Sequence, residues 1–209
     1  METRNYLQDI SEIKNMMSRS SRFISLSGLS GILAGIYALL GATAAYFQLE
    51  KFENLSYTEK EWISDNSYST LFFNLVIIAL IVLSAAILTG IFLTLRKAKK
   101  QNEKIWNPVS KRLLANFALP LVAGGLFCIV LIQYGIAGLV APATLIFYGL
   151  ALVNASKFTI GDIKYLGVSN ILIGLLATQF IGYGLYFWAL GFGVFHIIYG
   201  IILYNKYDR

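Results

Sequence analysis

Histidine is the side chain best suited to proton chemistry near neutral pH, and this sequence contains one, His196. It lies in a long apolar stretch with Tyr199, and another apolar stretch contains Asn170 and Ser169. If these stretches are helices that cross a bilayer, a rise of about 1.5 Å per residue places His196 about 17 Å and Asn170 about 21 Å below one surface. The four residues therefore form a candidate intramembrane polar site.

Two interpretations of this site remain open. Hydrogen bonds between helices stabilise a membrane bundle by about 0.6 to 2 kcal/mol each, and a structural bond in the bundle core is the favoured interpretation. The alternative is a ligand-binding or proton-sensing site. Ser169 with His196 is the one conceivable nucleophile and base, but no glycine-framed nucleophile motif surrounds the serine. With Cys128 as the single cysteine, we expect no catalytic residue, no metal site and no cofactor.

The elements that carry these residues are apolar blocks separated by charged segments. Hydrophobic residues make up 57% of the 209-residue chain and charged residues 13%, whereas soluble proteins average about 25% charged. A bilayer core about 30 Å thick requires about 20 helical residues per crossing. The sequence predicts an all-α polytopic membrane protein with a transmembrane domain at 23–204, a tail at 205–209 and six spans, at 23–47, 70–95, 113–134, 138–156, 165–183 and 185–204.

The lysines and arginines predict the orientation of the spans. All but two of the 17, Lys51 and Lys60, fall in segments that share one side of the membrane if there are six crossings. Basic residues gather on the cytoplasmic side, so both termini are expected in the cytoplasm. The turns after the third and fifth spans are short and uncharged, which predicts three helical hairpins. The same topology accounts for the net charge of +6 without nucleic acid.

Two polar segments flank the spans on the predicted cytoplasmic side. Residues 1–22 have apolar positions at helical spacing, which indicates either an amphipathic helix on the membrane surface or a plain extension of the first span. The basic segment 96–112 serves as a topology signal, or binds anionic lipid or an acidic partner. Within it, Asn107 and Pro108 predict an N-cap and a first-turn proline.

Small residues predict where the helices approach one another, since helices associate in lipid where small side chains allow close contact. The expected packing positions are glycines at steps of three, four or seven in spans one, five and six: Gly28, Gly31 and Gly35; Gly167 and Gly174; Gly193 and Gly200. Residues 28–35 (GLSGILAG) resemble 167–174 (GVSNILIG), and 148–154 (YGLALVN) resemble 199–205 (YGIILYN). These matches indicate a repeated hairpin or convergence in apolar sequence.

The segments SSRFISLSGLSGILAGIYALLGA (20–42) and LYFWALGFGVFHIIYGIILY (185–204) resemble a family of small uncharacterised bacterial inner-membrane proteins. That resemblance implies a bacterial cytoplasmic membrane and no known activity. The three-hairpin plan is also loosely similar to six-span acid-resistance membrane proteins, in architecture alone.

The absence of charged residues deep in the spans argues against ion pumps and proton-coupled carriers. The leading hypothesis is a non-enzymatic membrane protein, a regulatory, accessory or stress-related component that assembles with itself or a partner through its glycine-rich faces. The alternative is a small channel or carrier with a polar site near His196 and Asn170. An intramembrane enzyme ranks last.

Overall fold

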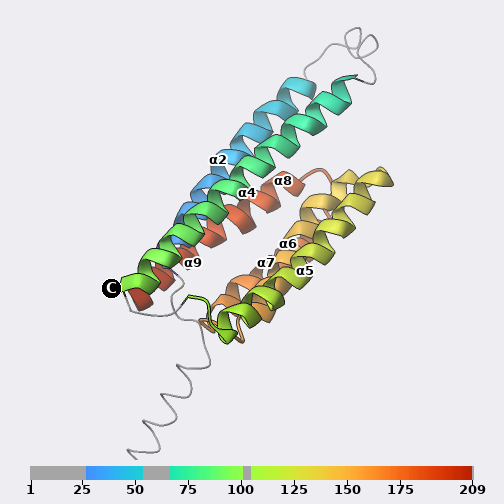
Figure 1. Ribbon diagram of the computed structural model, residues 1–209. Helices are drawn as coiled ribbons and strands as arrows, with labels where there is room; N and C mark the ends of the chain where they lie inside the picture. Colours follow the sequence, from blue (N-terminus) through green and yellow to red (C-terminus); the bar gives the residue numbers. More distant parts are fainter. Residues whose placement is uncertain (1–26, 54–65, 101–104, 209) are drawn as a thin grey trace, which may run out of the picture.

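The computed structural model describes residues 27–53, 66–100 and 105–208, and these ranges contain helices and no β-strand (Figure 1). This confirms the all-helical class. The amphipathic helix predicted at 1–22, the first residues of span one and most of the first outer loop lie outside the described residues.

The described chain forms a series of apolar helices. They are α2 (Gly28–Glu53), α4 (Asn66–Lys100), α5 (Pro108–Gln133), α6 (Val140–Ala155), α7 (Ile163–Ala177), α8 (Gly184–Trp188) and α9 (Phe195–Leu203). A 3-10 turn, η1 (Ala137–Leu139), precedes α6, and π-helical segments η2 (Ala189–Val194) and η3 (Tyr204–Asp208) precede and follow α9.

Five continuous helical segments, some of which join several of these elements, are long and apolar enough to cross a membrane: Gly28–Phe52, Thr70–Lys100, Pro108–Gln133, Ala137–Ala155 and Gly184–Tyr207. The segment Gly184–Tyr207 combines α8, η2, α9 and most of η3. The remaining helix, α7, has 15 residues, which at about 1.5 Å each is shorter than the hydrocarbon core. The chain is thus a helical, membrane-embedded protein with five candidate spans and one shorter apolar helix.

The start of α5 follows the prediction from Asn107 and Pro108. The Asn107 side chain accepts a hydrogen bond from the Ser110 backbone N–H (2.8 Å), and the Asn107 backbone N–H donates to the Ser110 hydroxyl (3.0 Å). This reciprocal pair satisfies two amides that the first helical turn leaves without partners. Pro108 is the first helical residue and has no backbone N–H that needs a partner. The helix α5 therefore begins at Pro108, before the predicted apolar span at 113–134.

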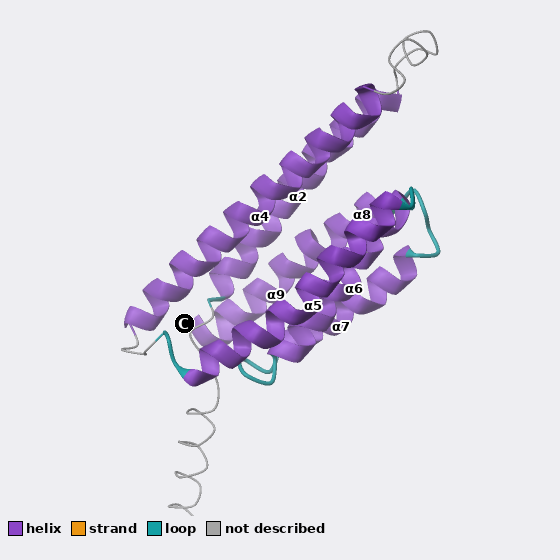
Figure 2. Ribbon diagram, turned by 45° about the vertical axis from the view of Figure 1, so that its right-hand side comes forward, coloured by secondary structure: helices purple, strands orange, loops and turns teal. Residues whose placement is uncertain are grey.

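The helices form two groups that meet along α6–α7 and α8–α9 (Figures 1 and 2). In one group α4 packs against α2, and α2 packs against η2 and α9. In the other, α5 packs against α6, and α6 packs against α7. The fifth and sixth predicted spans are joined by a short turn, but α7 lies mainly along α6 and α9 lies mainly along α2. Helices adjacent in sequence are therefore not always the main packing partners.

The outside of both groups is apolar and exposed. In α4 the apolar window of the candidate span contains no buried residue, and large side chains such as Leu88 (67% exposed) and Phe92 (63%) face outward. The interior contains small or tightly fitted residues, including Ala38, Leu145, Ala151 and Ala177. This inversion of a soluble fold is expected when lipid surrounds the helices.

Candidate functional site

His196 is buried where the two helix groups meet. Its side chain is 6% exposed, and its Nε2 lies 2.7 Å from the Tyr148 hydroxyl on α6. Its Nδ1 lies 2.8 Å from the Gly191 carbonyl oxygen in η2. Because a carbonyl can only accept, Nδ1 carries the proton and donates to Gly191. In the neutral ring Nε2 is then an acceptor, and the Tyr148 O–H donates to it.

The π-helical segment η2 explains how a backbone carbonyl reaches this ring. Gly191 lies five residues before His196, the spacing at which a π-helix closes its hydrogen bonds. Gly191 belongs to this π-helical segment, and its carbonyl oxygen lies within hydrogen-bond distance of the imidazole. The Tyr148 ring packs on Phe192 (centroids 5.0 Å apart) and on His196 (5.3 Å). The histidine is therefore fixed by two hydrogen bonds and by aromatic packing.

Asn170 lies on the other side of Gly191. Its side chain is fully buried, and its Nδ2 donates to the Leu166 carbonyl one turn earlier (2.9 Å). Its Oδ1 has no hydrogen-bond partner, and a Cβ built on Gly191 would lie 2.6 Å from this atom. The structure thus brings Asn170 and His196 to the same glycine, as their predicted depths suggested, without a hydrogen bond between them.

The other two predicted members of the site lie apart from this contact. The Tyr199 hydroxyl is buried without a partner, and the ring packs against an apolar cluster that includes Ile160, Ile163 and Leu203. Ser169 is partly exposed on α7, and the structure gives it no hydrogen bond with His196. No group of three metal-ligating side chains occurs among the described residues.

Tyr148 is the partner that sequence reasoning missed. A tyrosine at the middle of an apolar span looks the same whether it faces lipid, an interface or another helix. A usable signal was present, because residues 148–154 match 199–205 and so pair Tyr148 with Tyr199. Both tyrosines prove to face the contact between the helix groups.

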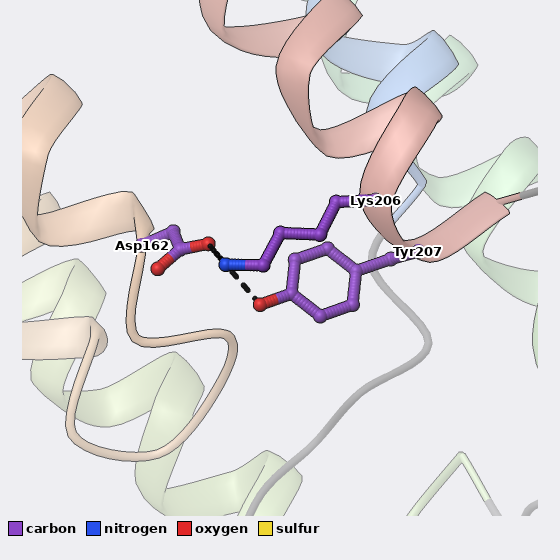
Figure 3. Close-up of polar contacts among 3 residues, drawn as sticks. All are labelled: Asp162, Lys206 and Tyr207. Carbon is purple, nitrogen blue, oxygen red and sulfur yellow. Dashed lines mark hydrogen bonds and ion pairs between the residues drawn. The ribbon is translucent and has the colours of Figure 1, made fainter.

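A second polar contact joins the groups at the end where the chain terminates (Figure 3). Asp162 Oδ2 accepts from Lys206 Nζ (2.6 Å) and from the Tyr207 hydroxyl (3.1 Å). The short segment between α6 and α7 that carries Asp162 is held by buried Thr159 and Ile160. The hydrogen bond from Lys206 holds the pKa of the Asp162 carboxyl below its usual value. The carboxylate thus links the segment after α6 to the C-terminal residues.

All seven predicted packing glycines lie at close contacts within the chain. A Cβ on Gly28 would lie 2.7 Å from the Gly200 carbonyl oxygen, and a Cβ on Gly31 would lie 3.3 Å from the Gly200 Cα. Gly35 meets Ile197 and the Gly193 carbonyl, and Gly193 meets the Leu39 side chain. These contacts form the α2–α9 seam, the line along which the two helices approach most closely.

An equivalent seam joins α6 and α7. A Cβ on Gly167 would lie 2.7 Å from the Gly149 carbonyl oxygen, and a Cβ on Gly174 would lie 2.8 Å from Ile146 Cγ1. Backbone atoms cannot move aside as a flexible side chain can, so both seams require glycine. We call the contacts of Gly167 with Gly149 and of Gly174 with Ile146 the α6–α7 seam.

A groove of about 480 Å³ lies at the opposite end of the bundle, beside α8. It is lined by aromatic and apolar side chains of the turn after α7 and of α8 and η2: Phe180, Tyr183, Tyr186, Phe187 and Leu190. None of the predicted polar residues lines it. Comparison with known protein families, curated proteins and solved structures finds no match to this chain.

Proposed function

We propose that the chain is a non-enzymatic integral membrane protein that acts as a regulatory, accessory or stress-related component of a membrane assembly. The observation that carries this proposal is the state of His196. Both ring nitrogens are engaged, by Tyr148 and by the Gly191 carbonyl, so the one imidazole of the chain serves packing. A catalytic base or a permeation site must lie within reach of its substrate, whereas this ring is 6% exposed and does not line the groove beside α8.

We further propose a topology of six crossings as three hairpins, with both ends in the cytoplasm of a bacterial inner membrane. The support is the equivalence of the two seams. Gly28 meets Gly200 as Gly167 meets Gly149, and Gly35 meets Ile197 as Gly174 meets Ile146. The two sequence matches, 28–35 with 167–174 and 148–154 with 199–205, align these same contacts. Repetition of a hairpin accounts for both facts.

This arrangement changes the proposed role of the glycine-rich faces. They are occupied by the chain's own helices, so we propose that they hold the scaffold together. A partner or a second copy would then meet the protein on its outward surface or at its termini. Anionic lipid or an acidic protein at the basic segment 96–112 remains part of the proposal.

The test is co-purification from native membranes after extraction in mild detergent. A C-terminally tagged chain should elute as a defined oligomer or with a specific partner, identified by mass spectrometry against a tagged six-span protein of similar size. A monodisperse monomer with no enriched partner, in several detergents and growth conditions, would contradict an accessory role.

A small channel or carrier is the second candidate, and one observation favours it. The Asn170 Oδ1 and the Tyr199 hydroxyl are buried without hydrogen-bond partners, and such atoms are rare in packed interiors unless water or a ligand meets them. Flux of a panel of ions and small solutes into liposomes tests this candidate. Transport by the wild type that is lost in Asn170→Ala supports it, and a silent panel excludes it.

A further inference from the structure

The second helices of all three hairpins share a pattern that is used in only two of them. Residues 87–93 of α4 (ILTGIFL), 146–152 of α6 (IFYGLAL) and 197–203 of α9 (IIYGIIL) each have isoleucine, glycine and leucine at the first, fourth and seventh positions. In α6 and α9 this isoleucine and glycine form the seams with α7 and α2. In α4 the corresponding residues are Ile87 and Gly90.

Each of the other two seams joins the second helix of one hairpin to the first helix of the next hairpin, with α2 following α9. By the same rule, α4 should meet α5. In both, the first helix of one hairpin supplies a small residue and, seven positions later, a glycine: Gly28 and Gly35 in α2, Gly167 and Gly174 in α7. In α5 the corresponding segment is 118–125 (ALPLVAGG), with Ala118 and Gly125 at these positions.

The two segments also lie at matching depths. Gly90 precedes Arg96 by the same number of residues by which Ala118 follows Arg112. Since α4 and α5 are consecutive helices joined at one end, equal distances from that end bring Gly90 level with Ala118. Ile87 lies three residues before Gly90 and Gly125 lies seven after Ala118, just as Ile146 lies three before Gly149 and Gly174 lies seven after Gly167.

The structure nevertheless leaves this third pair apart. A Cβ built on Gly90 or on Gly125 would meet no atom of the described chain within 4 Å. The main contacts of α4 are with α2 and those of α5 are with α6, and α4 and α5 do not lie side by side in either view (Figures 1 and 2). A glycine inside a helix weakens it when no close approach requires the glycine, so both positions have a cost that this arrangement does not explain.

We infer that α4 and α5 close on each other along Ile87, Gly90, Ala118 and Gly125, forming a third seam equivalent to the other two, and that this structure holds that seam open. The inference rests on the three-hairpin plan proposed above and goes beyond it. Closure adds a contact between the two helix groups, at α4 of one and α5 of the other.

Disulfide trapping in native membranes tests the closure, in a Cys128→Ser background that has no other cysteine. The reporter is Ile87→Cys with Gly125→Cys, and Gly90→Cys with Ala118→Cys is a second reporter at the same seam. A protease site placed within residues 101–104 shows whether the two halves of one chain are linked. We expect oxidation to give an intramolecular disulfide in both reporters.

Two controls flank these reporters. Gly41→Cys with Val82→Cys joins α2 to α4 at a contact already present, since a Cβ on Gly41 would lie 3.6 Å from the Val82 Cβ, within disulfide range. Leu88→Cys with Gly125→Cys places one thiol on the outward side of α4 and should stay unlinked. If the Gly41 and Val82 pair is fully linked while both reporters stay reduced, or link only two separate chains, the third seam does not exist. Co-purification tests the proposed accessory role and does not depend on whether this disulfide forms, so failure of one proposal can be told from failure of the other.

Discussion

The His196 ring and the Tyr148 hydroxyl form a 2.7 Å hydrogen bond between the two helix groups. It lies inside the predicted membrane region, where neither group has water as an alternative partner. Because the Gly191 carbonyl fixes the other ring nitrogen as the donor, the Tyr148 hydroxyl must present its proton to Nε2. The bond therefore sets the orientation of the ring and joins α6 to α9.

Loss of this bond should destabilise the fold by about 0.6 to 2 kcal/mol. Tyr148→Phe leaves Nε2 buried without a donor, and His196→Phe leaves the Tyr148 hydroxyl buried without an acceptor. We expect the double substitution to cost less than the sum of the two singles, because neither polar group remains to be satisfied. Reversible unfolding in mixed micelles measures all three variants, with Tyr134→Phe, 77% exposed, as the matched control. Additive single and double effects would show that the pair is not coupled.

Substitution of the seam glycines should separate them into two classes. In Gly28→Ala and Gly167→Ala the new methyl carbon would lie 2.7 Å from a backbone carbonyl oxygen of the facing helix, which is closer than van der Waals contact. The helices must therefore move apart, at a cost of about 1 to 3 kcal/mol. Gly90→Ala and Gly125→Ala add the same methyl in open space in this structure and should cost the open arrangement nothing, so any cost that they show measures the proposed contact between α4 and α5. An unchanged unfolding free energy in Gly28→Ala and Gly167→Ala would mean that the α2–α9 and α6–α7 seams are not as close as this structure has them.

The contact of Asp162 with Lys206 predicts a defined pH dependence. The lowered pKa of Asp162 means that the folded state favours the charged carboxylate more than the unfolded chain does. The contribution to stability is then complete above the unfolded pKa of about 3.9 and is lost as pH falls through the folded value. Asp162→Asn should lower Tm by a constant amount from pH 8 to pH 5.

The Tm difference between wild type and Asp162→Asn should shrink below pH 4, where the wild-type carboxyl also becomes neutral. Lys206→Gln should reproduce the same profile, and Lys164→Gln, which removes a nearby lysine outside this contact, should leave it as in the wild type. A difference that persists unchanged at pH 3 would show that the asparagine acts by some other route than loss of the ion pair.

The sequence predicted the fold class because charge and apolar length alone decide it. Blocks of about 20 uncharged residues fit a helix in lipid and little else, and the Asn107 cap was readable because it depends on residues close in sequence. The end of α7 was not readable. Residues 178–183 continue the apolar pattern, but the chain turns there, with Gly182 at a φ of 99°.

The candidate site was predicted in part, for a related reason. Depth along a helix follows from residue number, so Asn170 and His196 were expected at similar levels, and both contact Gly191. Which helices are neighbours does not follow from residue number, so Tyr148 was missed. The π-helical segment η2, which contains Gly191, was also not predicted, because no residue type marks such a segment.

The number of crossings is the last prediction, and the 15-residue α7 is the element that decides it. Asp162 precedes α7 and Lys206 follows α9, yet their side chains are 2.6 Å apart. Residues in contact at one end of the bundle share one membrane surface, so the chain between them must cross an even number of times. If α8–α9 forms one crossing, we predict that α7 forms the other, together with the apolar turn that follows it.

Labelling of single cysteines by an impermeant maleimide tests this topology in intact cells and in inverted vesicles, again with Cys128→Ser. Lys104→Cys, Lys157→Cys and Arg209→Cys should all react only in inverted vesicles, and Lys60→Cys only in intact cells. Arg209→Cys is the informative position, because a chain in which α7 does not cross places it outside while Lys157→Cys stays inside. Reaction of Arg209→Cys in intact cells would therefore establish five crossings and would require that Lys206 and Asp162 lie on opposite sides of the membrane.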